Sequence, residues 1–191
     1  MKKKRVGVLI SGNGSNMLAL VRAAQAEDYP CEIACVVSNN PEAGGLVIAS
    51  DQGIATHVIN HRQYASREDF DAALNACLQT QTPDLIACAG FMRIMTPVLI
   101  EPWRGRMINI HPSLLPLYKG LHTHARAIAN AQKFGGCSVH FVTAELDGGP
   151  VIAQTRVPIV QGDTAETLAA RVLVEEHKLY PKALAMVAQK L

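Results

Sequence analysis

The segment Asn109, Ile110, His111 places an amide and an imidazole two positions apart within an apolar stretch. On a β-strand, residues 109 and 111 point to the same face, so the two polar groups project together while Ile110 faces the opposite layer. A carboxamide can donate to a carbonyl oxygen that gains negative charge, and an imidazole can exchange a proton near neutral pH. The pair is a candidate catalytic site, although a histidine taken alone is more often structural.

A third candidate, Asp147, stands in the turn Leu146, Asp147, Gly148, Gly149, Pro150. Aspartate often stabilises a turn by bonding to nearby backbone, so this residue has a structural reading as well as a catalytic one. If the turn reaches His111, the carboxylate favours the imidazolium form and raises its pKa. The histidine then becomes a usable proton donor.

The glycine-rich segment at residues 11–16, SGNGSN, follows a short apolar run and precedes a helical pattern. Glycines let backbone amides turn inward, and a helix start adds free N–H donors, so a phosphate is well placed there. The dinucleotide fingerprint is not met, because Met17 replaces its third glycine and the second strand ends in Ser38 and Asn39, without an acidic partner for the ribose. The alternatives are a phosphate loop of another kind and an ordinary strand-to-helix turn.

The elements that must position these residues follow an alternating pattern. Short apolar runs separated by helical stretches predict parallel strands covered by helices, in an α/β, Rossmann-like three-layer sandwich. Two extended runs joined through the Asp147 turn predict an antiparallel hairpin in the C-terminal part. Asp163 and Glu166 resemble a capping box at the start of a long helix, in which Pro181 should force a kink or a break. The expected strands are 6–10, 33–37, 55–59, 85–89, 107–110, 138–143 and 151–159.

Composition limits the class of protein. A chain of 191 residues, 49% of them hydrophobic, can bury one sizeable core, so we expect a single domain over residues 1–191. The net charge of +2 is too small for a general nucleic-acid binder. No apolar run is long enough to cross a membrane, and the basic start lacks the hydrophobic region of a signal peptide. We expect a cytoplasmic protein with small-molecule substrates and neither nucleic acid nor membrane as partner.

The cysteines and histidines also bear on the chemistry. The five cysteines contain no Cys-x-x-Cys pair and mostly sit in apolar runs, which predicts buried, reduced thiols. His111, His122, His124 and His140 lack the spacing of a recognisable zinc motif, so we expect no metal.

Six segments together resemble the folate-dependent phosphoribosylglycinamide formyltransferases of purine biosynthesis. The resemblance runs from about residue 6 to about residue 181, in order and without large gaps. The Asn109, His111 and Asp147 set is shared with formyltransferases that act on other acceptors, while the first segment in a one-domain chain points to the glycinamide ribonucleotide enzymes. The segments are SGNGSN at 11–16, AGFMRIM at 89–95, NIHPSLLP at 109–116, GLHTH at 120–124, SVHFV at 138–142 and LDGGPVI at 146–152.

The resemblance implies transfer of a formyl group from 10-formyltetrahydrofolate, as co-substrate, to the primary amine of glycinamide ribonucleotide, without a metal or a covalent enzyme intermediate. It gives the catalytic roles to Asn109, His111 and Asp147. It also implies two binding sets. The acceptor set is Gly14, Ser15, Asn16 and Glu176; the folate set is Arg67, Met92, Arg93, Ile94, Met95, Asn109, Thr143 and Asp147.

Three questions stay open at this stage. A formyl-folate hydrolase, or a formyltransferase with another amine acceptor, is the alternative activity. A non-catalytic nucleotide-binding domain shares the same α/β plan, but it has no need of the three polar residues. The chain could act as a monomer or a homodimer, because one sequence does not show which surface pairs with a copy of itself.

Overall fold

The computed structural model describes residues 2–191, which form seven strands and six α-helices. Two short 3-10 helices, His61–Gln63 and Glu101–Trp103, complete the elements. The strands are β1 Lys4–Ile10, β2 Cys31–Ser38, β3 Ala55–Val58, β4 Leu85–Cys88, β5 Met107–His111, β6 Phe134–Phe141 and β7 Val151–Pro158. The helices are α1 Ser15–Ala24, α2 Gly44–Asp51, α3 Arg67–Gln81, α4 Pro97–Ile100, α5 Thr123–Ala129 and α6 Ala165–Ala188.

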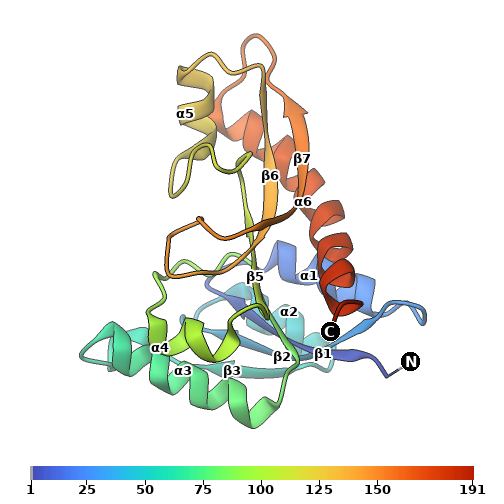
Figure 1. Ribbon diagram of the computed structural model, residues 1–191, viewed down its shortest axis with the longest axis vertical. Helices are drawn as coiled ribbons and strands as arrows, with labels where there is room; N and C mark the ends of the chain where they lie inside the picture. The colour runs from blue at the N-terminus through green and yellow to red at the C-terminus, as the bar shows by residue number, and fades with distance from the viewer. Residues whose placement is uncertain (1) are drawn as a thin grey trace.

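The strands form one mixed sheet in the order β3-β2-β1-β4-β5-β6-β7. The first five in this order are parallel, whereas β6 pairs antiparallel with both β5 and β7. Figure 1 shows the β5 to β7 part extending away from the parallel part, with α5 beside it. The predicted α/β fold with a C-terminal antiparallel hairpin is therefore confirmed.

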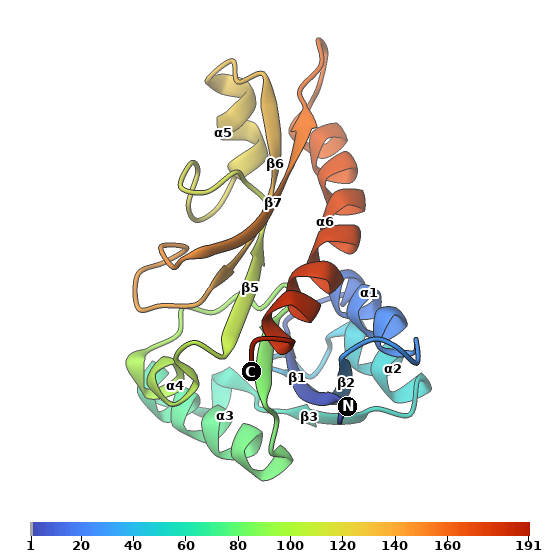
Figure 2. The same ribbon diagram turned by 45° about the vertical axis from the view of Figure 1, so that its right-hand side comes forward.

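Helices cover the two faces of the sheet unequally. One core cluster joins α1, α2 and α6 to one face, and a second joins α3 and α4 to the other (Figure 2). Alternation along β1 explains the division, because Val8 and Ile10 belong to the first cluster and Leu9 to the second. Both faces of β1 and β4 are thus buried, as their continuous apolar runs require, whereas the edge strand β3 is mostly exposed.

The carboxyl ends of three neighbouring strands meet at one edge of the sheet. Leu9 of β1 and Asn109 of β5 are both in register with Cys88 of β4, which lies between them. Two residues further on, Ser11, just past the end of β1, and His111, the last residue of β5, lie at the same level. Two strand spacings separate them, which corresponds to about 10 Å. This edge carries the candidate residues, where open α/β sheets bind their ligands.

Helix α6 differs from the sequence prediction in two details. Its capping box is formed by Thr164 and Thr167, not by Asp163 and Glu166, while Asp163 pairs with Arg171. Pro181 does not break the helix, which continues to Ala188. The residues around Pro181 are buried against the sheet and α1, and this packing outweighs the loss of one backbone hydrogen bond. Tertiary contact, not local propensity, sets the length of α6.

The cysteines are free thiols, and four of the five are buried, as predicted. Burial raises the pKa of Cys88 and that of Cys137 to about 12, so neither supplies a thiolate near neutral pH. Within residues 2–191, no helix is both long enough and apolar enough to span a membrane.

Candidate functional site

The last strand residues of β5 carry the first two candidates. Asn109 and His111 alternate with Ile108 and Ile110, which belong to the core cluster on the α6 side of the sheet. The two polar side chains therefore leave the opposite face, as the spacing predicted. The side chain of His111 is only 7% exposed, so its charge state depends on the groups that touch it.

The turn after β6 brings the third candidate to the same place. Asp147 adopts a left-handed backbone conformation (φ 49°), which aspartate tolerates better than most residues. A side chain at Gly149 would collide with the backbone carbonyl of Phe141, so this glycine lets the turn fold back onto β6. The geometry places the Asp147 carboxylate over the end of β5.

Asp147 receives three contacts. Its Oδ2 atom lies 3.3 Å from Nδ1 of His111 and accepts the backbone N–H of Gly120 at 2.9 Å. Its Oδ1 atom lies 3.5 Å from Nε2 of His140. Burial acts to raise the pKa of Asp147, but His140, the Gly120 amide and the charge of His111 together hold the pKa below its usual value. The carboxylate is therefore ionised at neutral pH.

The imidazole of His111 faces an acceptor at each nitrogen. Its Nε2 donates to the carbonyl of Tyr118 at 3.0 Å, and its Nδ1 faces Asp147. Burial nevertheless lowers the pKa of His111 below 6.5, although both acceptors act in the opposite direction. The sequence predicted that Asp147 would raise the pKa of His111. Asp147 does act in that direction, but burial has the larger effect, so the prediction was wrong for the net shift. A sequence pattern did not reveal how deeply the ring is buried.

His140 lies beside Asn109 and Asp147 in the same cluster. The sequence suggested this residue only as a metal ligand, for which its spacing gave poor support. It is the register partner of Asn109 across β5 and β6, and its Nε2 lies 3.3 Å from the Asn109 amide nitrogen. Its Nδ1 donates to the carbonyl of Phe141 at 2.9 Å. A neutral His140 therefore accepts from Asn109 through Nε2, and a protonated one donates to Asp147. Only the β5–β6 pairing register could have revealed this contact in advance.

The 11–16 loop folds tightly between β1 and α1. Gly14 has a left-handed backbone (φ 73°), and a side chain there would lie 2.9 Å from Cα of Gly45. A side chain on Gly45 would in turn collide with Ile10, so the two glycines allow the loop and the start of α2 to touch. The backbone N–H of Gly45 donates to the carbonyl of Gly12 at 3.0 Å. The sequence did not predict the role of Gly45.

Asn16 and Glu176 meet although 160 residues separate them. Asn16 donates to Oε2 of Glu176 at 2.6 Å, from the first turn of α1 to the middle of α6. The structure thus brings together the two ends of the predicted acceptor set. Burial raises the pKa of Glu176, while the hydrogen bond from Asn16 acts to lower it. A buried carboxylate with one donor retains capacity to accept hydrogen bonds from a ligand.

Glu176→Gln is expected to stabilise the folded chain at pH 7. Since the pKa is raised in the folded state, ionisation there is less favourable than in the unfolded chain. This penalty is absent below the usual value of 4.5, grows as the pH rises from 4.5 to the folded pKa and is complete above it. The variant should therefore unfold at a higher temperature than the parent at pH 7 and at the same temperature at pH 4. Glu175→Gln, which removes the more exposed neighbour, is the control. A lower melting temperature for Glu176→Gln at pH 7 contradicts the expectation.

The 89–96 loop between β4 and α4 carries four of the eight residues of the predicted folate set. Met92 and Ile94 are apolar yet 67% and 56% exposed, which leaves them free to cover an apolar ligand. Arg93 lies over the ring of Phe70 at 5.9 Å, and Arg67 precedes Phe70 by one turn of α3. The predicted residues of this loop and of α3 therefore lie close together.

Thr143 lies before the Asp147 turn, where its hydroxyl donates to the carbonyl of Glu145 at 3.3 Å. Val142, its neighbour, is tied by its N–H to the carbonyl of Met107 on β5 at 2.9 Å. Thr143 is thus held beside β5, the strand that carries Asn109. Within residues 2–191, Thr143 makes no hydrogen bond with the 89–96 loop.

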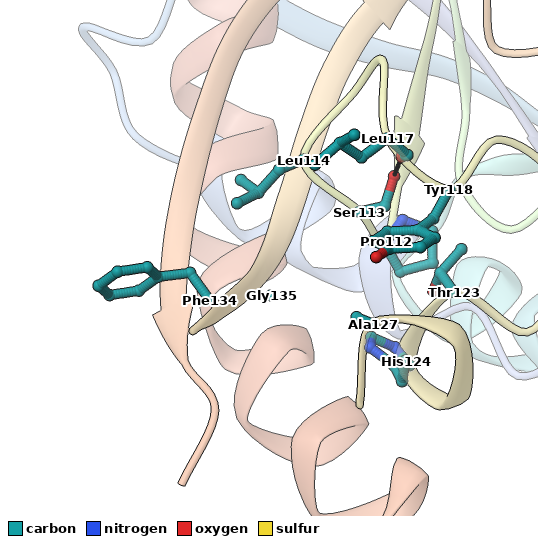
Figure 3. A pocket seen from close by; sticks show the side chains of 10 residues that line it. All are labelled: Pro112, Ser113, Leu114, Leu117, Tyr118, Thr123, His124, Ala127, Phe134 and Gly135. Carbon is teal, nitrogen blue, oxygen red and sulfur yellow. Dashed lines mark hydrogen bonds between the residues drawn. The ribbon is translucent and has the colours of Figure 1, made fainter. Parts of the chain in front are cut away.

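A small cavity lies beneath the segment that follows β5. Figure 3 shows Pro112, Ser113 and Tyr118 around it, with Thr123 and His124 of α5 opposite. Its volume of about 10 Å³ is close to that of one water molecule and far below that of a folate. The cavity is therefore not the substrate site.

Within residues 2–191, no group of three or more His, Cys, Asp or Glu side chains is arranged to hold a metal ion.

Fold and site together define an α/β protein of the Rossmann-like class, with an amide, an imidazole and an ionised carboxylate gathered at the carboxyl edge of its sheet. The chain belongs to the formyl transferase family, since the model of that family matches residues 4–184.

Named relatives agree with this membership. Phosphoribosylglycinamide formyltransferase of Escherichia coli K12 is 46% identical over 181 residues, which are 95% of this chain and 85% of that protein. The human trifunctional purine biosynthetic protein adenosine-3 is 44% identical over 187 residues, which are 98% of this chain but only 18% of that protein. A crystal structure of phosphoribosylglycinamide formyltransferase from Brucella melitensis superposes with a TM-score of 0.94 at 53% identity, covering 98% of this chain and 96% of the other.

Proposed function

We propose that this chain transfers the formyl group of 10-formyltetrahydrofolate to the primary amine of glycinamide ribonucleotide, a step of de novo purine (IMP) biosynthesis. The observation that carries the proposal is the contact of Asp147 with His111 beside Asn109, in a chain so similar to relatives named for this reaction. A cytoplasmic location and small-molecule partners agree with this function.

The first step is attack of the amine nitrogen on the formyl carbon. A C–N bond forms, the carbonyl π electrons move to oxygen, and the nitrogen becomes positive. Asn109 has two amide N–H groups, and only one of them faces His140, so the other is available to the oxyanion. His111 is the second donor to the oxyanion.

The His111 proton depends on the charge around the ring. The neutral form predominates in the ligand-free protein at pH 7, because the pKa lies below 6.5. A developing oxyanion adds negative charge and favours the imidazolium, as Asp147 already does. The Nε2 atom must leave the carbonyl of Tyr118 before it can reach a substrate oxygen. The segment at 116–123 is therefore the candidate lid.

The second step returns the carbonyl and releases the folate. Asp147, ionised at neutral pH, accepts the proton of the ammonium through a water molecule. The oxyanion then collapses, and the bond between the formyl carbon and folate nitrogen breaks. That nitrogen takes up the same proton from Asp147 through the water molecule, which restores the carboxylate and gives tetrahydrofolate and the formylated amine. Protons and electrons balance without a covalent enzyme intermediate.

The two substrates occupy opposite sides of this cluster in the proposal. Gly14, Ser15 and Asn16 hold the acceptor phosphate and neighbouring atoms, with Glu176 on the ribose hydroxyls. The donor lies against the 89–96 loop, Arg67 and Thr143. The exposure of Met92 and Ile94 and the closeness of Arg93 to α3 support this arrangement.

The direct experiment mixes the protein with 10-formyltetrahydrofolate and glycinamide ribonucleotide and follows the deformylated folate spectroscopically. Turnover should require the acceptor. Equal turnover without acceptor favours a formyl-folate hydrolase, and turnover only with a different amine favours another formyltransferase. Binding of both ligands without any turnover favours a non-catalytic domain.

A further inference from the structure

Ser11 joins three strand ends at the carboxyl edge of the sheet. It follows β1, which lies between β2 and β4. Its hydroxyl donates to Oδ1 of Asn39, just after β2, at 2.5 Å. The same oxygen accepts the backbone N–H of Met92 at 2.8 Å, and the Ser11 N–H donates to the carbonyl of Gly90 at 3.2 Å. One small side chain therefore ties the 11–16 loop to the 89–96 loop.

We propose that Ser11 is a positioning residue that couples acceptor binding to donor binding. The inference rests on the proposed function, because that function places the acceptor on the 11–16 loop and the donor on the 89–96 loop. Gly14 is three residues from Ser11, and Met92 is bonded to it directly. A ligand that fixes either loop also fixes the shared hydroxyl, so the second ligand meets a loop already in position. The effect is reciprocal by thermodynamic necessity.

Asp71 anchors the other end of the 89–96 loop and provides the comparison. It is fully buried on α3, and its Oδ2 accepts the backbone N–H of Thr96 at 2.5 Å. Burial raises the pKa of the Asp71 carboxyl overall, while the charge of nearby Arg93 acts to lower it. The Asp71 carboxylate accepts its hydrogen bond from the 89–96 loop, not from the 11–16 loop. Asp71 therefore supports the donor side, and Ser11 supports both sides.

The test measures dissociation constants of tetrahydrofolate and of glycinamide ribonucleotide, each with and without a saturating amount of the other. This product and substrate pair cannot react, so binding is read alone. In the parent protein each ligand should tighten the other at least about fivefold, within the usual range of coupling between sites. Ser11→Ala should bring this factor close to one, and Ser11→Thr, which keeps the hydroxyl, should retain most of it. Asp71→Asn should weaken tetrahydrofolate binding but leave the factor unchanged.

Two controls separate coupling from stability and from the proposed function. Thr164→Ala removes a helix-capping hydroxyl at the start of α6, so its coupling factor should match the parent despite lower stability. If Ser11→Ala does not fold, Ser11→Cys supplies the same test with a weakly hydrogen-bonding thiol. A parent factor of one, or an unchanged factor in the Ser11 variant, overturns the inference. Absence of acceptor-dependent formyl transfer by the parent overturns the proposed function instead.

Discussion

Asp147→Asn is expected to lower turnover at least about a hundredfold while the protein stays folded. The substitution keeps the shape of the side chain and an oxygen that can accept the Gly120 N–H. It removes the negative charge that faces His111 at 3.3 Å and His140 at 3.5 Å. The new amide N–H₂ points a donor where the carboxylate offered an acceptor, so the neutral ring of His111 is favoured and the imidazolium that donates to the oxyanion is disfavoured. Steady-state kinetics with both substrates saturating measure the loss.

Glu145→Gln is the matched control, because Glu145 stands in the same turn and loses the same charge. Its carboxylate is 70% exposed and pairs with Lys119, away from the two histidines. An exposed ion pair contributes little to stability, so the variant should fold like the parent. Because the lost charge lies away from the two histidines, its turnover should stay within about twofold of that of the parent. Turnover of a folded Asp147→Asn protein within a few fold of the parent removes the proposed role of Asp147.

Local pattern was sufficient for the strands and for the shared face of Asn109 and His111. Both depend on alternation, which short-range geometry imposes on any extended chain. The capping box of α6 lies one residue later than the sequence predicted, because several consecutive residues there can cap a helix. The sequence predicted Asp163 as the first residue of the box, whereas Thr164 makes the capping hydrogen bonds in the structure. Arg171, eight residues on, binds Asp163 and takes it out of the cap.

The parts of the site that sequence could not derive depend on distant contacts. Glu176 reaches Asn16 only because α6 packs on α1, and the resemblance, not any spacing, had singled it out. His140 faces Asn109 through strand register, which no single segment encodes. The net pKa shift of His111 depends on burial by the whole fold, so a pairwise argument from Asp147 gave the wrong direction.

His111→Ala is expected to lower turnover at least about a hundredfold, and the loss should be larger at acidic pH, where more of the ring is protonated, than at pH 7. His111→Gln should lose nearly as much, although its amide can still donate to the carbonyl of Tyr118. The glutamine variant separates the two explanations of the loss. It keeps a hydrogen bond to the 116–123 segment and cannot ionise, so recovery of full activity in this variant would mean that only the contact matters.

The pH dependence of the His111 effect follows from the direction of its pKa shift. Dividing kcat/KM of the parent by that of His111→Ala at each pH cancels the ionisation of the substrate amine. Asp147 stays ionised throughout, since its pKa lies below the usual 3.8. The ratio should be largest at low pH and decline as the pH rises through the pKa of His111, below 6.5, because the protonated form is the donor. A ratio that instead increases with pH identifies the neutral ring as the active form and makes His111 a base, which reverses the direction of proton transfer in the proposed first step.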